Sequence, residues 1–279
     1  MVERTALELE QATQGAALDT KTESRSRALK VAPAFAYRTT LVVIPTYNES
    51  DNLPLLIGEL LALEPELDIL VVDDGSPDGT GEIAEALGRE TGCVTVIHRQ
   101  GKQGLGTAYV RGFQYALERG YEYVVQMDAD FSHQPSDLPP LLRAVKDADV
   151  VIGSRNVPGG KTESWSRLRD ALSKGGSLYA RLMLKLPIRD CTGGFKVLRR
   201  RALCALDLDA LQSSGFGFQI EVNYACARAG MKFAEIPIRF PNRTRGTSKM
   251  SSRIVLEAWL LVLRLRLGLQ APALASGAC

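Results

Sequence analysis

The chain has 279 residues, 45% of them hydrophobic, which is enough for one large core, and no run of eighteen apolar residues occurs, so a membrane-spanning helix is not expected. The formal net charge is only +2, but residues 1–150 carry 13 Lys and Arg against 24 Asp and Glu, whereas residues 151–279 carry 21 against 8. This asymmetry favours a metal as partner of the acidic half and phosphates or an anionic membrane surface as partners of the basic half, with drifted surface charge as the alternative.

Residues 1–38 are polar with mixed charge. They predict a flexible N-terminal tail, without the basic start and apolar stretch of a signal peptide. From Thr39 onward, short apolar runs alternate with helix-like stretches. The predicted strands are 41–44, 69–72, 94–97, 123–127 and 150–152, and the predicted helices are 50–63, 79–90, 105–119 and 136–147. Such alternation is typical of an α/β protein with a mostly parallel, doubly wound sheet.

The alternation fades after Arg155. The remaining predicted elements are helices at 165–185, 218–229 and 251–269 and a strand at 233–240. The last helix has an uneven polar face, so it is either an interfacial helix that inserts Trp259 and leucines into lipid or a terminal helix that packs on the core. The sequence thus divides into a flexible tail (1–38), a main domain (39–250) and an amphipathic, membrane-proximal helix with a short tail (251–279).

Polar residues follow several predicted strands, and open α/β sheets bind ligands beyond these strand ends. Asp128 and Asp130 are the sharpest signal. Side chains at i and i+2 of an extended segment point to the same side, and two carboxylates so placed repel each other unless a cation lies beside them. Mg²⁺ and Mn²⁺ prefer oxygen ligands. The pair predicts a site for one of these ions, with backbone capping by both aspartates as the alternative.

Three further groups carry weaker signals. Asp73 and Asp74 end a strand, where they bind a base or ribose or form an Asx turn. The 102–106 stretch precedes a helix and either holds an anion or is a plain glycine turn. Basic residues in or beside loops suit a lipid phosphate or a diphosphate, with surface charge as the alternative for at least half of them. They are Arg155, Arg167, Arg169, Lys174, Arg243, Arg245 and Lys249.

Nine stretches, in this order along residues 40–250, carry a family resemblance. They are VVIPTYNESDNLP (42–54), ILVVDDGSPDGT (69–80), VIHRQGKQGLGTAYVRGF (96–113), MDADFSHQP (127–135), VVIGSRNVPGG (150–160), SRLRDALSKGG (166–176), RDCTGGFKVLRR (189–200), GFQIE (217–221) and FPNRTRGTSKM (240–250). The chain resembles the GT-A, family 2 glycosyltransferases, and within them the dolichol-phosphate and polyprenol-phosphate mannose synthases. The resemblance implies a GT-A, Rossmann-like catalytic domain over 39–250.

The resemblance also implies residue roles on the donor side. Pro45, Tyr47 and Glu49 match donor-nucleotide contacts, and Asp73 and Asp74 match positions that bind the base or ribose. The expected donor set also includes Lys102, Asp128, Ala129 and Asp130.

Asp128 and Asp130 match a metal-binding pair that also positions the diphosphate. Some relatives carry a glutamine at the position of Ser132 and use it as a third metal ligand. Ser132 is therefore included in the expected metal set, with water as the alternative third ligand. On the acceptor side, five residues match family positions that bind the lipid phosphate or the diphosphate. They are Arg155, Arg169, Ser173, Arg243 and Lys249. The expected catalytic set is Asp128, Asp130, Arg155, Arg243 and Lys249.

The implied reaction is an inverting transfer of mannose from GDP-mannose to dolichyl or polyprenyl phosphate, with Mg²⁺ or Mn²⁺. The alternatives are a UDP-sugar (glucose-type) transferase for the same lipid and a nucleotide-sugar-binding subunit without activity. The resemblance implies a cytoplasmic protein, peripheral on the cytoplasmic face of a membrane, that touches lipid through its last helix or a separate membrane-spanning partner. Nucleic acid is not an expected partner.

Overall fold

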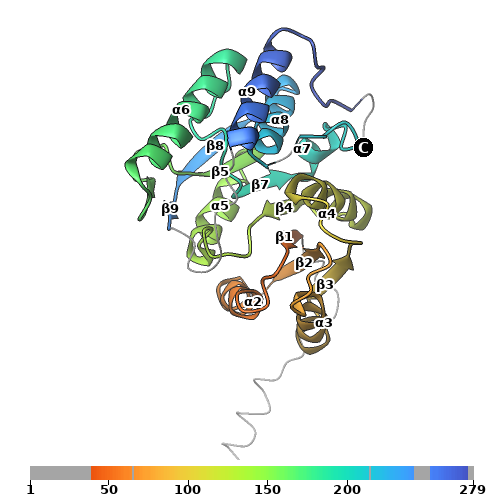
Figure 1. Ribbon diagram of the computed structural model, residues 1–279. Helices are drawn as coiled ribbons and strands as arrows, with labels where there is room; N and C mark the ends of the chain where they lie inside the picture. Colours follow the sequence, from red (N-terminus) through yellow and green to blue (C-terminus); the bar gives the residue numbers. More distant parts are fainter. Residues whose placement is uncertain (1–38, 65, 214, 242–251, 276–279) are drawn as a thin grey trace, which may run out of the picture. The chain divides into compact units, whose positions relative to one another are not determined.

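The computed structural model describes residues 39–64, 66–213, 215–241 and 252–275, with the backbone alone for 252–255. All of them lie in one compact unit, Arg38–Cys279. The central sheet has the strand order β3-β2-β1-β4-β7-β5-β8 (Figure 1). Its strands are β1 (Thr40–Thr46), β2 (Leu67–Asp73), β3 (Val94–His98), β4 (Tyr123–Gln126), β5 (Val150–Ser154), β7 (Lys196–Arg199) and β8 (Phe233–Pro237).

Only β7 runs antiparallel to its neighbours in this sheet. A second, two-stranded sheet pairs β6 (Lys161–Thr162) with β9 (Arg239–Phe240). The predicted α/β class with a mostly parallel sheet is therefore confirmed.

Helices cover both faces of the sheet, because successive strand residues point to opposite sides. On one face, Leu41 and Val43 of β1 pack with α4 (Leu105–Arg119), α6 (Arg167–Leu184), α7 (Arg200–Cys204), α8 (Gly215–Arg228) and α9 (Ser252–Arg266). On the other face, Val42 and Ile44 pack with α2 (Leu53–Leu63), α3 (Thr80–Thr91) and α5 (Leu138–Ala144). The short 3-10 helix η1 (Pro135–Asp137) leads into α5. The fully apolar strand runs are thus buried on both sides.

The structure differs from the predicted elements after Arg155. Strand β7 was not predicted, because its four residues begin and end with a charged side chain and give no apolar run. The predicted strand 233–240 is divided into β8 and β9. Strand β5 ends at Ser154, which pairs with Pro237, so the chain beyond Pro237 leaves β5 and pairs with β6.

The last helix packs on the core with one side and leaves its other side exposed, so its insertion into lipid stays a prediction. Its inner residues Leu261, Val262 and Leu265 belong to the core that α6 and α8 also share. Its outer residues Leu256, Trp259, Leu260 and Leu263 are exposed. Within the described residues, no helix is long and apolar enough to cross a membrane.

Candidate active site

The ends of β1, β2, β4 and β5 lie at one edge of the sheet. The parallel register aligns Thr46 with Asp73 and Val43 with Gln126, so the chain leaves β4 toward Asp128 and Asp130 at the edge where β1 leaves toward Tyr47. Because β7 is antiparallel, its first residue rather than its last meets this edge. The 190–194 loop that leads into β7 therefore joins the same site.

Asp128 is held by two groups that the sequence reasoning did not single out. The Tyr109 hydroxyl donates to Asp128 Oδ1 at 2.8 Å, and the Asp128 backbone N–H donates to His133 Nδ1 at 2.9 Å. Tyr109 is fully buried. Burial and the Asp128 charge raise the pKa of Tyr109 well above its ordinary value, so its hydroxyl stays a proton donor. Both residues lie in stretches that carried the family resemblance, but no spacing rule connects either of them to Asp128.

The carboxylates suit a hard divalent cation. Asp128 Oδ2 forms no hydrogen bond with a described residue, while Asp130 Oδ1 accepts the Ser132 backbone N–H at 3.0 Å. Ser132 is buried and Ala129 lies between the two aspartates, also buried. Within the described ranges, no group of three or more His, Cys, Asp or Glu side chains is arranged to hold a metal. A pair of carboxylates fits Mg²⁺ or Mn²⁺, which commonly take their remaining oxygens from water and substrate phosphates.

The carboxylates of Asp73 and Asp74 both accept hydrogen bonds from other residues of the protein. Asp73 accepts hydrogen bonds from the Thr46 and Ser76 hydroxyls at 2.8 and 2.5 Å and from the Ser76 backbone at 2.9 Å. Asp74 Oδ2 accepts the backbone N–H of Gln103 and Gly104, and its Oδ1 lies 3.2 Å from Arg99 Nη1. The first arrangement is an Asx-type turn at the strand end, the alternative that the sequence left open. The second fixes the loop that carries Lys102.

Tyr47 and Lys102 come together at this end of the sheet. Lys102 Nζ lies 4.3 Å from the centroid of the Tyr47 ring, a cation–π distance. Glu49 accepts a hydrogen bond from the Asn52 side chain at 2.8 Å and therefore braces the start of α2. Pro45, within β1, is partly buried. The structure thus gathers the predicted donor-side residues around the ends of β1 and β2.

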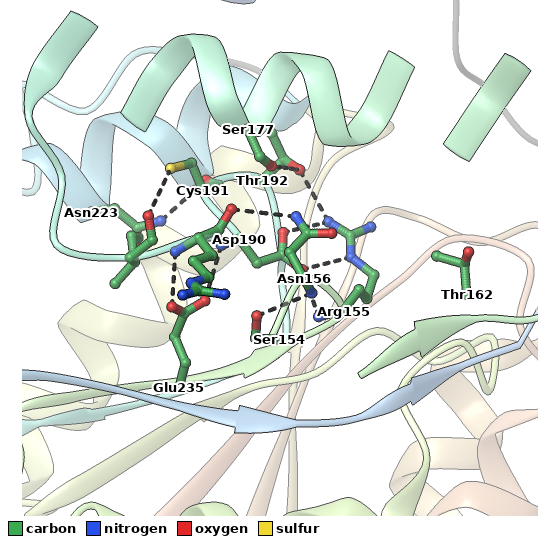
Figure 2. A network of polar contacts seen from close by, with 12 residues as sticks. Ser154, Arg155, Asn156, Thr162, Ser177, Asp190, Cys191, Thr192, Asn223 and Glu235 are labelled. Carbon is green, nitrogen blue, oxygen red and sulfur yellow. Dashed lines mark hydrogen bonds and ion pairs between the residues drawn. The ribbon is translucent and has the colours of Figure 1, made fainter. Parts of the chain in front are cut away.

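Arg155 forms a buried ion pair with Asp190 (Figure 2). Its Nε and Nη2 donate to the two Asp190 oxygens at 2.8 and 2.6 Å, its backbone N–H donates to Asp190 Oδ2 at 2.9 Å, and Nη2 also donates to Thr192 at 3.0 Å. Burial alone would raise the pKa of Asp190, but the Arg155 guanidinium outweighs burial and holds that pKa below its ordinary value. Glu235 accepts the backbone N–H of Arg189 and Asp190 and so anchors the loop.

Aromatic rings connect this ion pair to the two aspartates. The Phe240 ring lies 5.6 Å from the His133 ring and 5.1 Å from the Arg155 guanidinium. Trp165 packs edge-on against Phe240 at 5.6 Å, and the Arg169 guanidinium lies 3.9 Å above the Trp165 ring. Arg155 and Arg169 therefore belong to one cluster that continues from the Asp128 backbone.

The other acceptor-side residues are less defined. Ser173 lies on α6, one turn after Arg169, and is partly buried. Arg243 and Lys249 fall within 242–251, outside the described residues. Sequence reasoning missed Tyr109, His133, Asp190, Trp165 and Phe240, because no pattern in the sequence indicates their contacts with Asp128, Arg155 and Arg169.

Comparisons with known proteins identify similar sequences and a similar structure. Glycosyl transferase family 2 matches residues 41–206. The chain is 52% identical over 224 residues to the undecaprenyl-phosphate mannosyltransferase of Micrococcus luteus, covering 80% of this chain and 92% of the relative. It is 47% identical over 225 residues to the polyprenol monophosphomannose synthase of Mycolicibacterium smegmatis, covering 80% and 85%. A mannosyltransferase from Pyrobaculum calidifontis, solved in complex with GDP-Man and Mn²⁺, has a TM-score of 0.54 at 18% identity, over 95% of this chain and 76% of that one. The last likeness confirms the predicted GT-A fold.

Proposed function

The chain belongs to glycosyl transferase family 2, and from that membership we propose that it transfers mannose from GDP-mannose to a polyprenyl phosphate, giving polyprenyl phosphate mannose. The names of the two relatives support mannose and the lipid phosphate as substrates. The observation that carries the proposal is the continuous cluster from Asp128 through His133 and Phe240 to Arg155 and Arg169. It leads from a carboxylate pair that suits a metal diphosphate to a basic group that suits a second phosphate.

The donor would lie across the ends of β1, β2 and β4. Tyr47 and Lys102 offer an aromatic face and a cation to the nucleotide, and Asp128 and Asp130 would hold the metal and the diphosphate. When bound, the divalent cation supplies Lewis-acid stabilisation of the departing diphosphate. The GDP-Man and Mn²⁺ found with the Pyrobaculum calidifontis protein support this donor and this kind of ion.

The reaction we propose is a single in-line displacement with inversion at the anomeric carbon. The nucleophile is an oxygen of the lipid phosphate, which is already ionised near neutral pH, so the protein needs no strong general base. Its residues would orient two polyanions and offset their mutual repulsion. Arg169, whose guanidinium lies 3.9 Å above the Trp165 ring, is the described cation that we assign to the incoming phosphate. Arg243 and Lys249 complete the proposed basic set.

The acceptor is a lipid, and α6 and α9 offer an apolar surface for a membrane. The Tyr179 ring of α6 stacks on the Trp259 ring of α9 with centroids 4.0 Å apart. We call the exposed leucines on and next to these two helices the leucine face: Leu168, Leu172, Leu178 and Leu182 on α6, Leu256, Leu260 and Leu263 on α9, and Leu267 directly after α9. The face begins at Leu168, beside Arg169. We propose that it rests on the cytoplasmic side of a bilayer, which would bring the lipid phosphate to the basic cluster.

The test is transfer of labelled sugar from GDP-mannose to a short polyprenyl phosphate, with Mg²⁺ or Mn²⁺ and with a chelator. We expect a mild-acid-labile lipid product that depends on the metal. Product from UDP-glucose but not from GDP-mannose would keep the reaction type and reject mannose. Absence of product from every donor, in the presence of membranes, would favour the non-catalytic subunit.

Asp130→Asn tests the carboxylate pair directly. The substitution removes the charge that a cation needs but keeps the shape and the Ser132 hydrogen bond, so we expect a normally folded protein without turnover. Turnover near that of the unchanged protein would reject the metal role of this pair.

A further inference from the structure

A cavity lies at the far end of α6 from the candidate active site. It has a volume of about 310 Å³ and is lined by Met183, Leu184, Lys185, Tyr224, Ala227, Arg228 and Arg266. These residues come from the C-terminal ends of α6, α8 and α9. Sixteen residues of helix at 1.5 Å each put Lys185 about 24 Å along α6 from Arg169, so the two sites are separate.

The charged residues that line this cavity are all basic. Lys185, Arg228 and Arg266 line it without any carboxylate. None of the three forms an ion pair or a side-chain hydrogen bond with another described residue. Basic residues at helix C-termini are common because they complement the helix dipole, which is the ordinary explanation for each of them alone. The dipole does not explain why three such cations share one hollow.

The backbone of Lys185 ends α6 beside the cavity. Lys185 caps α6 with φ of 54°, in the left-handed region where glycine is the usual residue. A lysine there carries a conformational cost that a glycine would avoid.

The cavity also adjoins the leucine face. Leu182 precedes the lining residue Met183, and Leu267 follows the lining residue Arg266, and both leucines are largely exposed. From this juxtaposition of three cations without a described ion-pair partner and an exposed leucine face, we propose that the cavity binds the phosphate headgroup of an anionic phospholipid. Met183, Leu184, Tyr224 and Ala227 would contact the glycerol and the first acyl carbons.

The test measures binding of dihexanoyl phosphatidylglycerol, dihexanoyl phosphatidylcholine and inorganic phosphate to the full-length protein by calorimetry. It needs no transfer activity, so it is independent of the proposed reaction. We expect saturable binding of the phosphatidylglycerol alone. Each of Lys185→Gln, Arg228→Gln and Arg266→Gln should weaken it roughly fivefold. The control Arg143→Gln/Lys146→Gln removes two exposed cations at the end of α5 and should leave binding unchanged.

Ala227→Phe separates a cavity from a diffuse basic surface, because it fills the hollow without changing charge. We expect it to abolish phosphatidylglycerol binding while circular dichroism stays that of the unchanged protein. Binding that survives Ala227→Phe would overturn the cavity as the site. Equal binding of inorganic phosphate would overturn the lipid headgroup as its ligand, and so would equal binding of phosphatidylcholine or no binding at all.

Discussion

The Tyr109 hydroxyl donates a 2.8 Å hydrogen bond to Asp128 Oδ1, and this contact ties helix α4 to the carboxylate pair at the end of β4. The same helix begins at Leu105, directly after Gly104, whose backbone N–H donates to Asp74. Helix α4 therefore links the loop that carries Lys102 to Asp128. A group that fixes the orientation of a metal ligand usually contributes to metal affinity although it never touches the metal.

Tyr109→Phe removes this hydrogen bond and little else. We expect the metal concentration that gives half-maximal activity to rise roughly tenfold, because Asp128 loses the contact that orients it. A titration of initial rates with Mn²⁺ measures the change. Tyr121→Phe is the matched control, since Tyr121 donates to Asp68 at 2.8 Å away from the site. If both variants shift the metal requirement equally, Tyr109 has no special role.

Asp190→Asn should destabilise the protein strongly. The substitution leaves the buried Arg155 guanidinium without its counter-charge, which typically costs about 3–5 kcal/mol of unfolding free energy. Denaturant unfolding at neutral pH measures the loss. Glu118→Gln is the control, because it breaks an exposed ion pair with Arg111 and should cost less than about 1 kcal/mol. Equal small losses in both variants would mean that Arg155 finds another partner.

Lys196 gives the fold a pH dependence of its own. It is fully buried, its Nζ donates to Asn223 at 2.9 Å, and burial lowers its pKa from 10.5 to about 8. Between these values the folded chain binds fewer protons than the unfolded chain, so this residue's contribution to stability rises as pH increases from about 8 to 10.5. The gain is on the order of 3 kcal/mol at 1.36 kcal/mol per pKa unit.

Lys196→Met isolates that contribution, because the other titrating groups are common to both proteins. Buried tyrosine and cysteine, including Tyr109 and Cys226, have raised pKa values and act in the opposite direction at high pH. We expect the stability difference between the two proteins to shift in favour of the unchanged protein between pH 8 and pH 10. A difference that stays constant over this range would show that Lys196 does not titrate there.

The leucine face should control membrane partitioning. Replacing Leu178, Leu182, Leu263 and Leu267 with serine removes exposed apolar area without touching the core, so vesicle binding should fall at least tenfold while thermal stability is kept. Vesicle sedimentation measures the fraction of protein that is bound. Leu55→Ser/Leu63→Ser on α2 removes two other exposed leucines and should have no effect. A similar loss from the α2 variant would indicate nonspecific adhesion.

The sequence alone determined where the first five strands lie along the chain and that the Asp128/Asp130 pair follows one of them. These follow from local rules, since buried parallel strands read as apolar runs and loop residues follow where the runs stop. It also predicted the last helix, and the core-packing alternative is confirmed by the buried Leu261 and Leu265, while insertion into lipid stays a prediction for the exposed Leu256 and Leu260.

Only the tertiary structure decided how these pieces meet. Strand β7 has no apolar signature of its own, yet its antiparallel insertion between β4 and β5 brings Asp190 to Arg155, 35 residues away in the chain. Tyr109 reaches Asp128 in the same way, across 19 residues, and Lys185 meets Arg228 and Arg266 only where three helices end. Such contacts depend on strand order and helix packing, and no local pattern of residue types encodes them.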